Sequence, residues 1–145
     1  MNDPKLIPSL LTSTKTIAVV GLSDNPAKPS HYVSAYMQQH SYRILPVNPA
    51  LAHVLGEPAH ASLTALVQSG ITPDLVNVFR LPSFLPGIVD EMLSLGLGRL
   101  WVQQGIVHPE AAAHAEANGI RVVMDRCIMI EHRQIQVEHR RTHLA

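Results

Sequence analysis

Short apolar runs alternate with longer amphipathic stretches along the whole chain, and this alternation constrains the fold more than any other feature. The run at 17–20 is apolar at every position, which is typical of a parallel strand buried on both faces. Further strands are predicted at 42–47, 75–79, 99–103 and 121–124, with a short extended piece within 56–61. Helices are predicted at 6–11, 31–40, 63–67, 82–95 and from Pro109 to a turn at Gly119. Because successive strand–helix units join through right-handed crossovers, the sequence predicts an α/β fold. This fold is a doubly wound, Rossmann-like parallel sheet of about five strands with helices on both faces.

The length and charge of the chain limit its architecture and its partners. At 145 residues we expect one domain over 1–145, with a core at about 15–133 and a polar C-terminal tail at 134–145. The net charge is zero, so no electrostatic field attracts nucleic acid or an anionic membrane. No apolar run approaches the length of about 18 residues that spans a bilayer, and no secretory signal is recognisable. The single Cys127 excludes an intramolecular disulfide and fits a reducing compartment, so we expect a cytoplasmic protein. A homodimer is left open.

The turn after the first predicted strand has the composition of a phosphate-binding βα loop. The strand runs into Gly21, a polar turn follows, and a helix is predicted to start near Ser30. Backbone N–H groups and the positive end of a helix receive anions in such an arrangement. The G-x-G-x-x-G spacing of a nicotinamide-dinucleotide site is absent, and the second strand ends in Asn48 and Pro49 where that site needs an acid. The loop therefore predicts a nucleotide-bearing ligand other than NAD.

Small, amide and basic residues follow the predicted strands. They are Gly21, Ser23, Asn25, Lys28, Ser30 and His31 after the first; Asn48 and Pro49 after the second; Phe79, Arg80 and Pro82 after the third; Gln103, Gln104, Gly105 and Ile106 after the fourth; and Asp125, Arg126 and Cys127 after the fifth. The carboxyl ends of parallel strands meet at one edge of a sheet, which is where such folds bind ligands. We therefore expect the ligand at this edge.

Five short motifs, in this order, resemble a known family. They are Gly-Leu-Ser-Asp-Asn-Pro-Ala-Lys-Pro-Ser at 21–30, Pro-Val-Asn-Pro at 46–49, Val-Phe-Arg at 78–80, Trp-Val-Gln-Gln-Gly-Ile at 101–106 and Met-Asp-Arg-Cys at 124–127. Together they resemble the small stand-alone bacterial CoA-binding proteins, which are similar to the CoA-binding domain of the succinyl-CoA synthetase α-subunit. The resemblance extends from about residue 15 to about residue 133.

The resemblance implies a role for each motif. The pyrophosphate and the pantetheine arm are implied to be bound by Ser23, Asp24, Asn25 and Pro26, and the nucleotide end by Asn48 and Pro49. The adenosine wall is implied to consist of Phe79 and Arg80. The residues implied to lie along the pantetheine arm are Gln103, Gln104 and Gly105. A synthetase lysine falls near Leu51 here, so the 3′-phosphate needs another cation: Arg80 first, then Lys28, Arg43 or His53. The phosphorylated histidine of the synthetase belongs to a second domain with no counterpart in this sequence. The resemblance therefore implies no ligase activity.

We interpret the chain as a module that binds CoA or an acyl-CoA without catalysis of its own. The residues expected to contact the ligand are Gly21, Ser23, Asp24, Asn25, Pro26, Lys28, Ser30, His31, Asn48, Pro49, Phe79, Arg80, Gln103, Gln104, Gly105, Ile106 and Cys127. One alternative is a small enzyme that acts on a CoA thioester or a nucleotide through Cys127 or His31. Another alternative is an NAD(P)-binding redox subunit.

The histidines and the single cysteine are further candidates for chemistry. None of the nine histidines forms a hydrolytic H-x-x-x-H pattern with a nearby acid, and the four-residue spacing of His139 and His143 falls in the expected polar tail. We therefore expect no metal site and assign no catalytic residue. A cysteine after a core strand is most often a small buried hydrophobe, so Cys127 is expected to be a packed wall residue. A mixed disulfide with the CoA thiol is the alternative.

Overall fold

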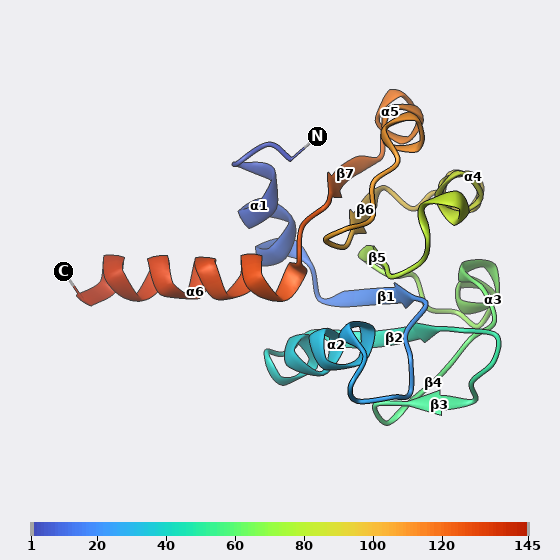
Figure 1. Cartoon of the computed structure of the whole chain (residues 1–145), viewed down its shortest axis with the longest axis horizontal. Helices are drawn as coiled ribbons and strands as arrows, with labels where there is room; N and C mark the ends of the chain where they lie inside the picture. Colours follow the sequence, from blue (N-terminus) through green and yellow to red (C-terminus); the bar gives the residue numbers. More distant parts are fainter. Residues whose placement is uncertain (1, 145) are drawn as a thin grey trace.

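The computed structural model describes residues 2–144, and its centre is a five-stranded parallel sheet (Figure 1). The strands are β1 (Thr16–Val20), β2 (Arg43–Val47), β5 (Leu75–Val78), β6 (Arg99–Val102) and β7 (Arg121–Met124). Their order is β2-β1-β5-β6-β7, and every neighbouring pair is parallel. The predicted doubly wound α/β fold with a five-stranded parallel sheet is confirmed.

Helices cover both faces of the sheet (Figure 1). One face carries α1 (Leu6–Ser13), α2 (Pro29–Gln39) and α6 (Ile128–Leu144), and the other carries α3 (Leu63–Gln68), α4 (Leu85–Leu95) with the short 3-10 turn η1 (Pro82–Phe84) before it, and α5 (Pro109–Ala117). Each layer has its own buried core. Leu10, Met37 and Trp101 belong to the first, whereas Leu66 and Met92 belong to the second. A small antiparallel hairpin, β3 (His53–Val54) and β4 (Glu57–Pro58), follows β2.

The strand order creates a switch point between β1 and β5. After β1 the chain moves to one side to form β2, and it then returns past β1 to form β5 and continues the other way. The connections that leave β1 and β5 therefore diverge at the carboxyl ends of these strands. In open α/β sheets this divergence opens the crevice in which ligands bind.

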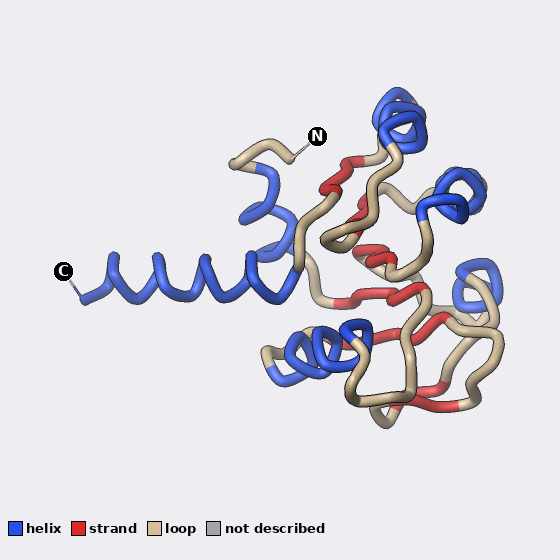
Figure 2. The backbone as a smooth tube through the Cα atoms, viewed as in Figure 1, coloured by secondary structure: helices blue, strands red, loops and turns tan. Residues whose placement is uncertain are grey.

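The C-terminal segment differs from the prediction. Residues 134–144 of the expected polar tail belong to α6, which extends away from the sheet in its second half (Figure 2), and residue 145 lies outside the described residues. Ile128 and His132 are buried and Ile135 is half-buried, whereas positions 136–142 are exposed. A sequence pattern reports a helix through a repeated apolar stripe, and α6 has such a stripe only in its first two turns. The helix was missed because most of its length is polar on every side.

Candidate ligand-binding site

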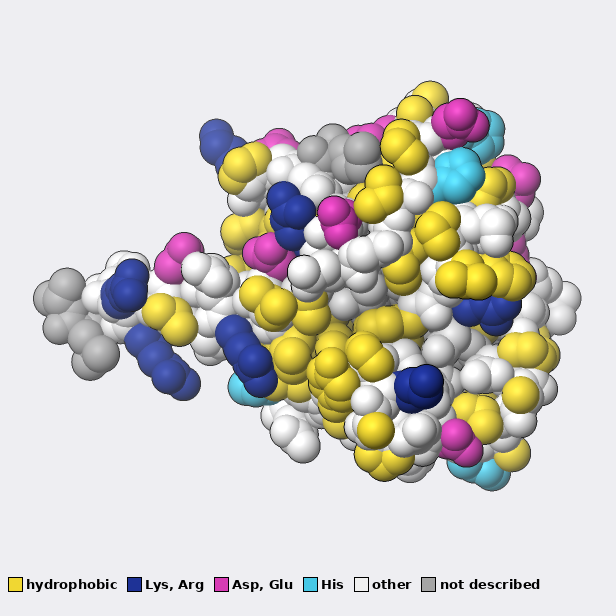
Figure 3. Space-filling model, viewed as in Figure 1, with side chains coloured by type: hydrophobic (Ala, Val, Ile, Leu, Met, Phe, Trp, Pro, Cys, Tyr) yellow, Lys and Arg dark blue, Asp and Glu magenta, His cyan; other side chains and the backbone are white. Residues whose placement is uncertain are grey.

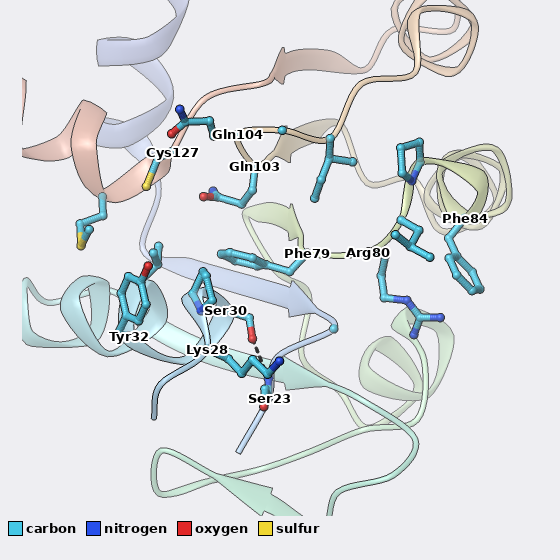
Figure 4. A pocket seen from close by; sticks show the side chains of 18 of the residues that line it. Ser23, Lys28, Ser30, Tyr32, Phe79, Arg80, Phe84, Gln103, Gln104 and Cys127 are labelled. Atoms are coloured by element: carbon cyan, nitrogen blue, oxygen red, sulfur yellow. Dashed lines mark hydrogen bonds between the residues drawn. The ribbon is translucent and has the colours of Figure 1, made fainter. Parts of the chain in front are cut away.

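A cavity of about 790 Å³ lies at the carboxyl ends of β1, β5 and β6 (Figure 4). Its walls come from the loops after these strands, from the start of α2 and from the start of α6. This volume is in the range of small-molecule sites, roughly 300–1,000 Å³. The cavity thus occupies the switch point of the sheet.

Gly21 lets the loop after β1 pack against the loop after β5. Its φ is +87°, and a Cβ added there would lie 2.5 Å from the carbonyl oxygen of Phe79 and 2.9 Å from Cδ of Arg80. The Phe79 oxygen belongs to the backbone, so it cannot move aside without distorting the chain. Only glycine therefore combines this conformation with so close an approach.

The polar side chains of the βα loop fold the loop on itself. The Ser23 N–H donates to Ser30 Oγ at 2.9 Å, the Asn25 N–H donates to Ser23 Oγ at 3.0 Å, and the Ala27 N–H donates to Asn25 Oδ1 at 3.0 Å. Both serine hydroxyls line the cavity, act as acceptors in these bonds and keep a proton to donate. The loop is thus preformed, and it presents donors to the cavity.

The start of α2 adds positive potential on the same side. The helix has eleven residues, begins with Pro29, and has no acidic residue in its first turn. The exposed Lys28 directly precedes it and lines the cavity. A helix N-terminus behaves as a partial positive charge and favours an anion nearby.

Arg80 supplies a second cation. Its guanidinium carbon lies 3.9 Å from the centre of the Phe84 ring, which holds the side chain by a cation–π contact. Among the described residues, neither Arg80 nor Lys28 forms an ion pair with a carboxylate, and no acidic side chain lines the cavity. Two cations without a carboxylate make the cavity suited to an anionic ligand.

Gln103 lines the cavity and belongs to a buried amide pair. Gln103 is 4% exposed, and its Nε2 donates to Oδ1 of Asn77 in the central strand at 2.9 Å. Gln104 also lines the cavity but is exposed. The loop after β6 is tied down because the Gly105 N–H donates to Asp125 Oδ1 at 2.7 Å. The amide groups therefore sit on a wall that is fixed from two sides.

The structure brings part of the expected set together. Gly21, Ser23, Lys28, Ser30, Phe79, Arg80, Gln103, Gln104, Gly105, Ile106 and Cys127 line the cavity, whereas Asp24, Asn25, Pro26, His31, Asn48 and Pro49 do not. Asn48 Nδ2 instead donates to the carbonyl oxygen of Leu22 at 3.0 Å, and its Oδ1 accepts from the Ala50 N–H at 2.9 Å. Asn48 therefore braces the loop after β1 from behind. Pro49 borders a neighbouring hollow of about 170 Å³ that Arg80 and Phe84 also line.

Among the cations considered for the 3′-phosphate, Arg43 is in the wrong place. It starts β2 at the amino edge of the sheet, and its Nε lies 3.5 Å from Glu57 Oε1. A strand places residues at its two ends on opposite edges of the sheet, so Arg43 cannot reach the cavity. Arg80 and Lys28 are the cations that line it.

Sequence reasoning missed most of the apolar lining. Pro29, Tyr32, Val33, Leu81, Phe84, Met129 and Ile130 also line the cavity. Tyr32 and Val33 lie in the predicted second helix and could have been found by extending the loop motif by one turn. Met129 and Ile130 come from the first turn of α6, a helix that the sequence does not predict, so no signal pointed to them.

A polar contact joins α2 to α6 behind the cavity wall. Tyr36 Oη lies 2.8 Å from Nδ1 of His132, which is 5% exposed. Burial, and then the neighbouring His40 ring, lower the pKa of His132 below its usual value, which favours the neutral imidazole. The contact fixes the first turns of α6 against α2.

This contact also bears on nucleophilic catalysis. His132 Nδ1 contacts Tyr36, its Nε2 lies 3.5 Å from Gln136, and Asp125 is bonded to the Gly105 N–H. His132 and Asp125, the groups near Cys127 in the sequence that could assist it as a nucleophile, thus each have a hydrogen-bond partner of their own. In the part of the chain that is described, no group of three or more His, Cys, Asp or Glu side chains is placed to hold a metal ion. Within that part, no helix has the length and apolar character needed to cross a membrane.

Comparison with known proteins identifies the family. The family model for a CoA-binding domain matches residues 15–133. The chain belongs to this CoA-binding family. The match extends over all five strands of the sheet and every loop that lines the cavity.

The chain is also similar to individual known proteins and solved structures. The chain is 44% identical over 126 residues to the uncharacterized protein YneT of Bacillus subtilis (strain 168), and the match covers 87% of this chain and 91% of that protein. A solved structure from Thermus thermophilus has 41% identity and a TM-score of 0.81, with 92% of this chain and 98% of that chain covered. The dinucleotide-forming acetyl-coenzyme A synthetase 1 of Ca. Korarchaeum cryptofilum has 17% identity and a TM-score of 0.63, covering 75% of this chain and 25% of that chain. This last similarity shows a shared fold.

Proposed function

We propose that the protein binds CoA or an acyl-CoA in the cavity at the carboxyl edge of the sheet and has no catalytic residue of its own. The observation that carries this proposal is the cavity itself. It lies at the switch point of a CoA-binding family fold and contains two cations and no carboxylate. A CoA ligand carries several phosphate charges, which such a site would complement.

The distribution of donors in the cavity suggests an orientation for the ligand. The pyrophosphate would lie against the loop after β1, where Ser23, Ser30 and Lys28 offer donors beside the start of α2. Arg80 would read the 3′-phosphate, with Phe79 against the adenosine. The pantetheine arm would then run along 103–106 towards Cys127.

Calorimetric titration with CoA, dephospho-CoA, NAD and NADP tests this function. We expect CoA to bind clearly more tightly than NAD or NADP, because the site has phosphate donors but lacks an acid for a ribose. Lys28→Ala should weaken CoA binding several-fold. The matched control is Lys15→Ala, which removes an equally exposed lysine at the amino edge of the sheet and should leave affinity unchanged. NAD binding as tight as CoA binding would refute the proposal.

A further inference from the structure

The cavity has two chemically different ends. Lys28, Ser23 and Ser30 lie together at the loop after β1, and Arg80 lies beside Phe84 (Figure 4). Cys127 and Tyr32 lie at the end remote from Arg80. The lining of that end comes from α2 and from the start of α6: Tyr32, Val33, Cys127, Met129 and Ile130. None of these side chains carries a charge, so this end has no cation for a phosphate.

We propose that this uncharged end is a subsite for the apolar acyl group of an acyl-CoA, so that the preferred ligand is an aliphatic acyl thioester and not free CoA. The inference rests on the proposed function, because the phosphates must occupy the cationic end for the thioester to reach α6. Free CoA would end in a single thiol there and leave much of this lining exposed to water. An acyl chain would cover it.

The exposure of the side chains supports an occupant. Ile130 is 48% exposed and Tyr32 is 46% exposed, although both are large and largely apolar. Hydrophobic side chains gather where α6 leaves the body of the molecule (Figure 3). Apolar surface concentrated at the mouth of a cavity is typical of a place that a ligand covers.

The wall is held in place without a ligand. Trp101 Nε1 donates to the carbonyl oxygen of Arg126 at 2.8 Å, which anchors the backbone directly before Cys127. Ile128 is fully buried, and the contact between Tyr36 and His132 joins α2 to α6 one turn further on. Because the subsite is preformed, little ordering cost would offset the gain from burying methylene groups.

The size of the expected effect follows from this burial. Full burial of one methylene group tightens binding about fourfold, which is 0.8 kcal/mol converted at 1.4 kcal/mol per tenfold. Since the walls are half-exposed, we expect about two- to threefold per methylene. The affinity should rise from acetyl-CoA through butyryl-CoA to hexanoyl-CoA and then level off once the subsite is filled.

Two variants on one face of α6 distinguish a specific acyl subsite from non-specific adhesion to exposed apolar surface. Ile130→Asn should abolish the gain with chain length, so that hexanoyl-CoA binds this variant no more tightly than CoA does. Val137→Asn is the matched control, because Val137 is 44% exposed and lies two turns further along the same face of α6 but outside the cavity. It should keep the full gain with chain length. Calorimetric titration of both variants with CoA and the three acyl-CoAs measures these affinities.

The outcomes are distinguishable. Tight binding of CoA with no gain for the acyl-CoAs would overturn the acyl subsite and leave the proposed function intact. Equal loss of the gain in Ile130→Asn and Val137→Asn would also overturn it, since the chain would then be adhering to exposed surface in general. Absence of binding by CoA and all acyl-CoAs would instead refute the proposed function.

Discussion

The two edges of the central sheet are built differently. At the amino edge, polar groups are consumed by bonds within the chain: Asp74 Oδ2 accepts from the N–H groups of Lys15 and Thr16 at 2.9 and 3.1 Å. The Asp74 N–H donates to Thr16 Oγ1 at 2.9 Å. At the carboxyl edge, Lys28 and Arg80 face a cavity and have no carboxylate partner among the described residues. The amino edge thus stabilises the fold through hydrogen bonds, whereas the cations of the carboxyl edge are available to a ligand.

Arginines show the same contrast. Arg99 Nη1 at the amino edge donates to Ser13 Oγ at 2.8 Å, and Arg43 pairs with Glu57. Arg80 at the carboxyl edge rests on the Phe84 ring and lines the cavity. Substitutions at the two edges should therefore separate stability from ligand binding.

The largest expected effect is on the free energy of unfolding and concerns Gly21, where the packing of two loops at the carboxyl edge requires glycine. Gly21→Ala is expected to lower the free energy of unfolding by about 3 kcal/mol, because it combines left-handed backbone strain with a Cβ in contact with the Phe79 carbonyl. Urea denaturation measures this value. The control is Gly70→Ala, where φ is +100° but nothing lies within 4 Å of an added Cβ, so only the strain of about 1 kcal/mol remains. Equal losses in both variants would show that the close approach costs nothing.

Arg80→Ala should come next and should affect binding. A charge-assisted hydrogen bond contributes about 1.5–3 kcal/mol, so we expect CoA affinity to fall by roughly 10- to 100-fold. Calorimetry should give a smaller loss for dephospho-CoA, which lacks the 3′-phosphate. If both ligands lose the same factor, Arg80 does not read that phosphate. Arg43→Ala, at the opposite edge, should leave both affinities unchanged.

Asp74→Ala should lower stability without changing CoA affinity, which is the reverse of the effect expected for Arg80→Ala. Removal of the acceptor for two backbone N–H groups should lower the free energy of unfolding by about 1–2 kcal/mol and leave CoA affinity unaltered. Burial tends to raise the pKa of Asp74, but the hydrogen bonds from Lys15 and Thr16 outweigh it, and the pKa lies below its usual value of 3.8.

The lowered pKa gives the sign of the pH dependence. The ionised carboxylate stabilises the folded state above the usual pKa, and this contribution is lost as the pH falls through the lowered value. The difference between wild type and Asp74→Ala should therefore shrink on acidification. A difference that stays constant from neutral pH to pH 2 would contradict the lowered pKa of Asp74. A loss of CoA affinity in the variant would contradict the division between the edges.

Cys127→Ser should have the smallest effect. The thiol lines the cavity as a half-buried side chain, so the serine variant should keep CoA affinity within about twofold. Incubation with CoA disulfide followed by intact-mass measurement should show no adduct. A stoichiometric adduct at neutral pH that is absent from the serine variant would make Cys127 a participant in thiol exchange.

Much of the cavity was predictable from local patterns. Apolar runs fix the strands through alternation and burial, and residues directly after a strand must lie at its carboxyl end, which is why Gly21, Phe79, Arg80 and Gln103 were found. Asn48 follows β2 and was expected at the ligand, yet its amide bonds to Leu22, 26 residues away. Proximity to a strand end predicts the edge on which a residue lies, but it does not predict what its side chain faces.

The alternation of strand and helix, the glycine at the sharp turn and the surplus of phosphate donors over acids all follow from residues close together in the chain. The strand order, the packing of α6 against α2 and the apolar end of the cavity arise from contacts between distant segments, such as Tyr36 with His132. Those contacts depend on which surfaces meet once every helix is docked, and a mostly polar helix such as α6 leaves little periodic trace of its docking. Local chemistry thus specified the anion-binding half of the site, whereas tertiary packing alone assembled the apolar half.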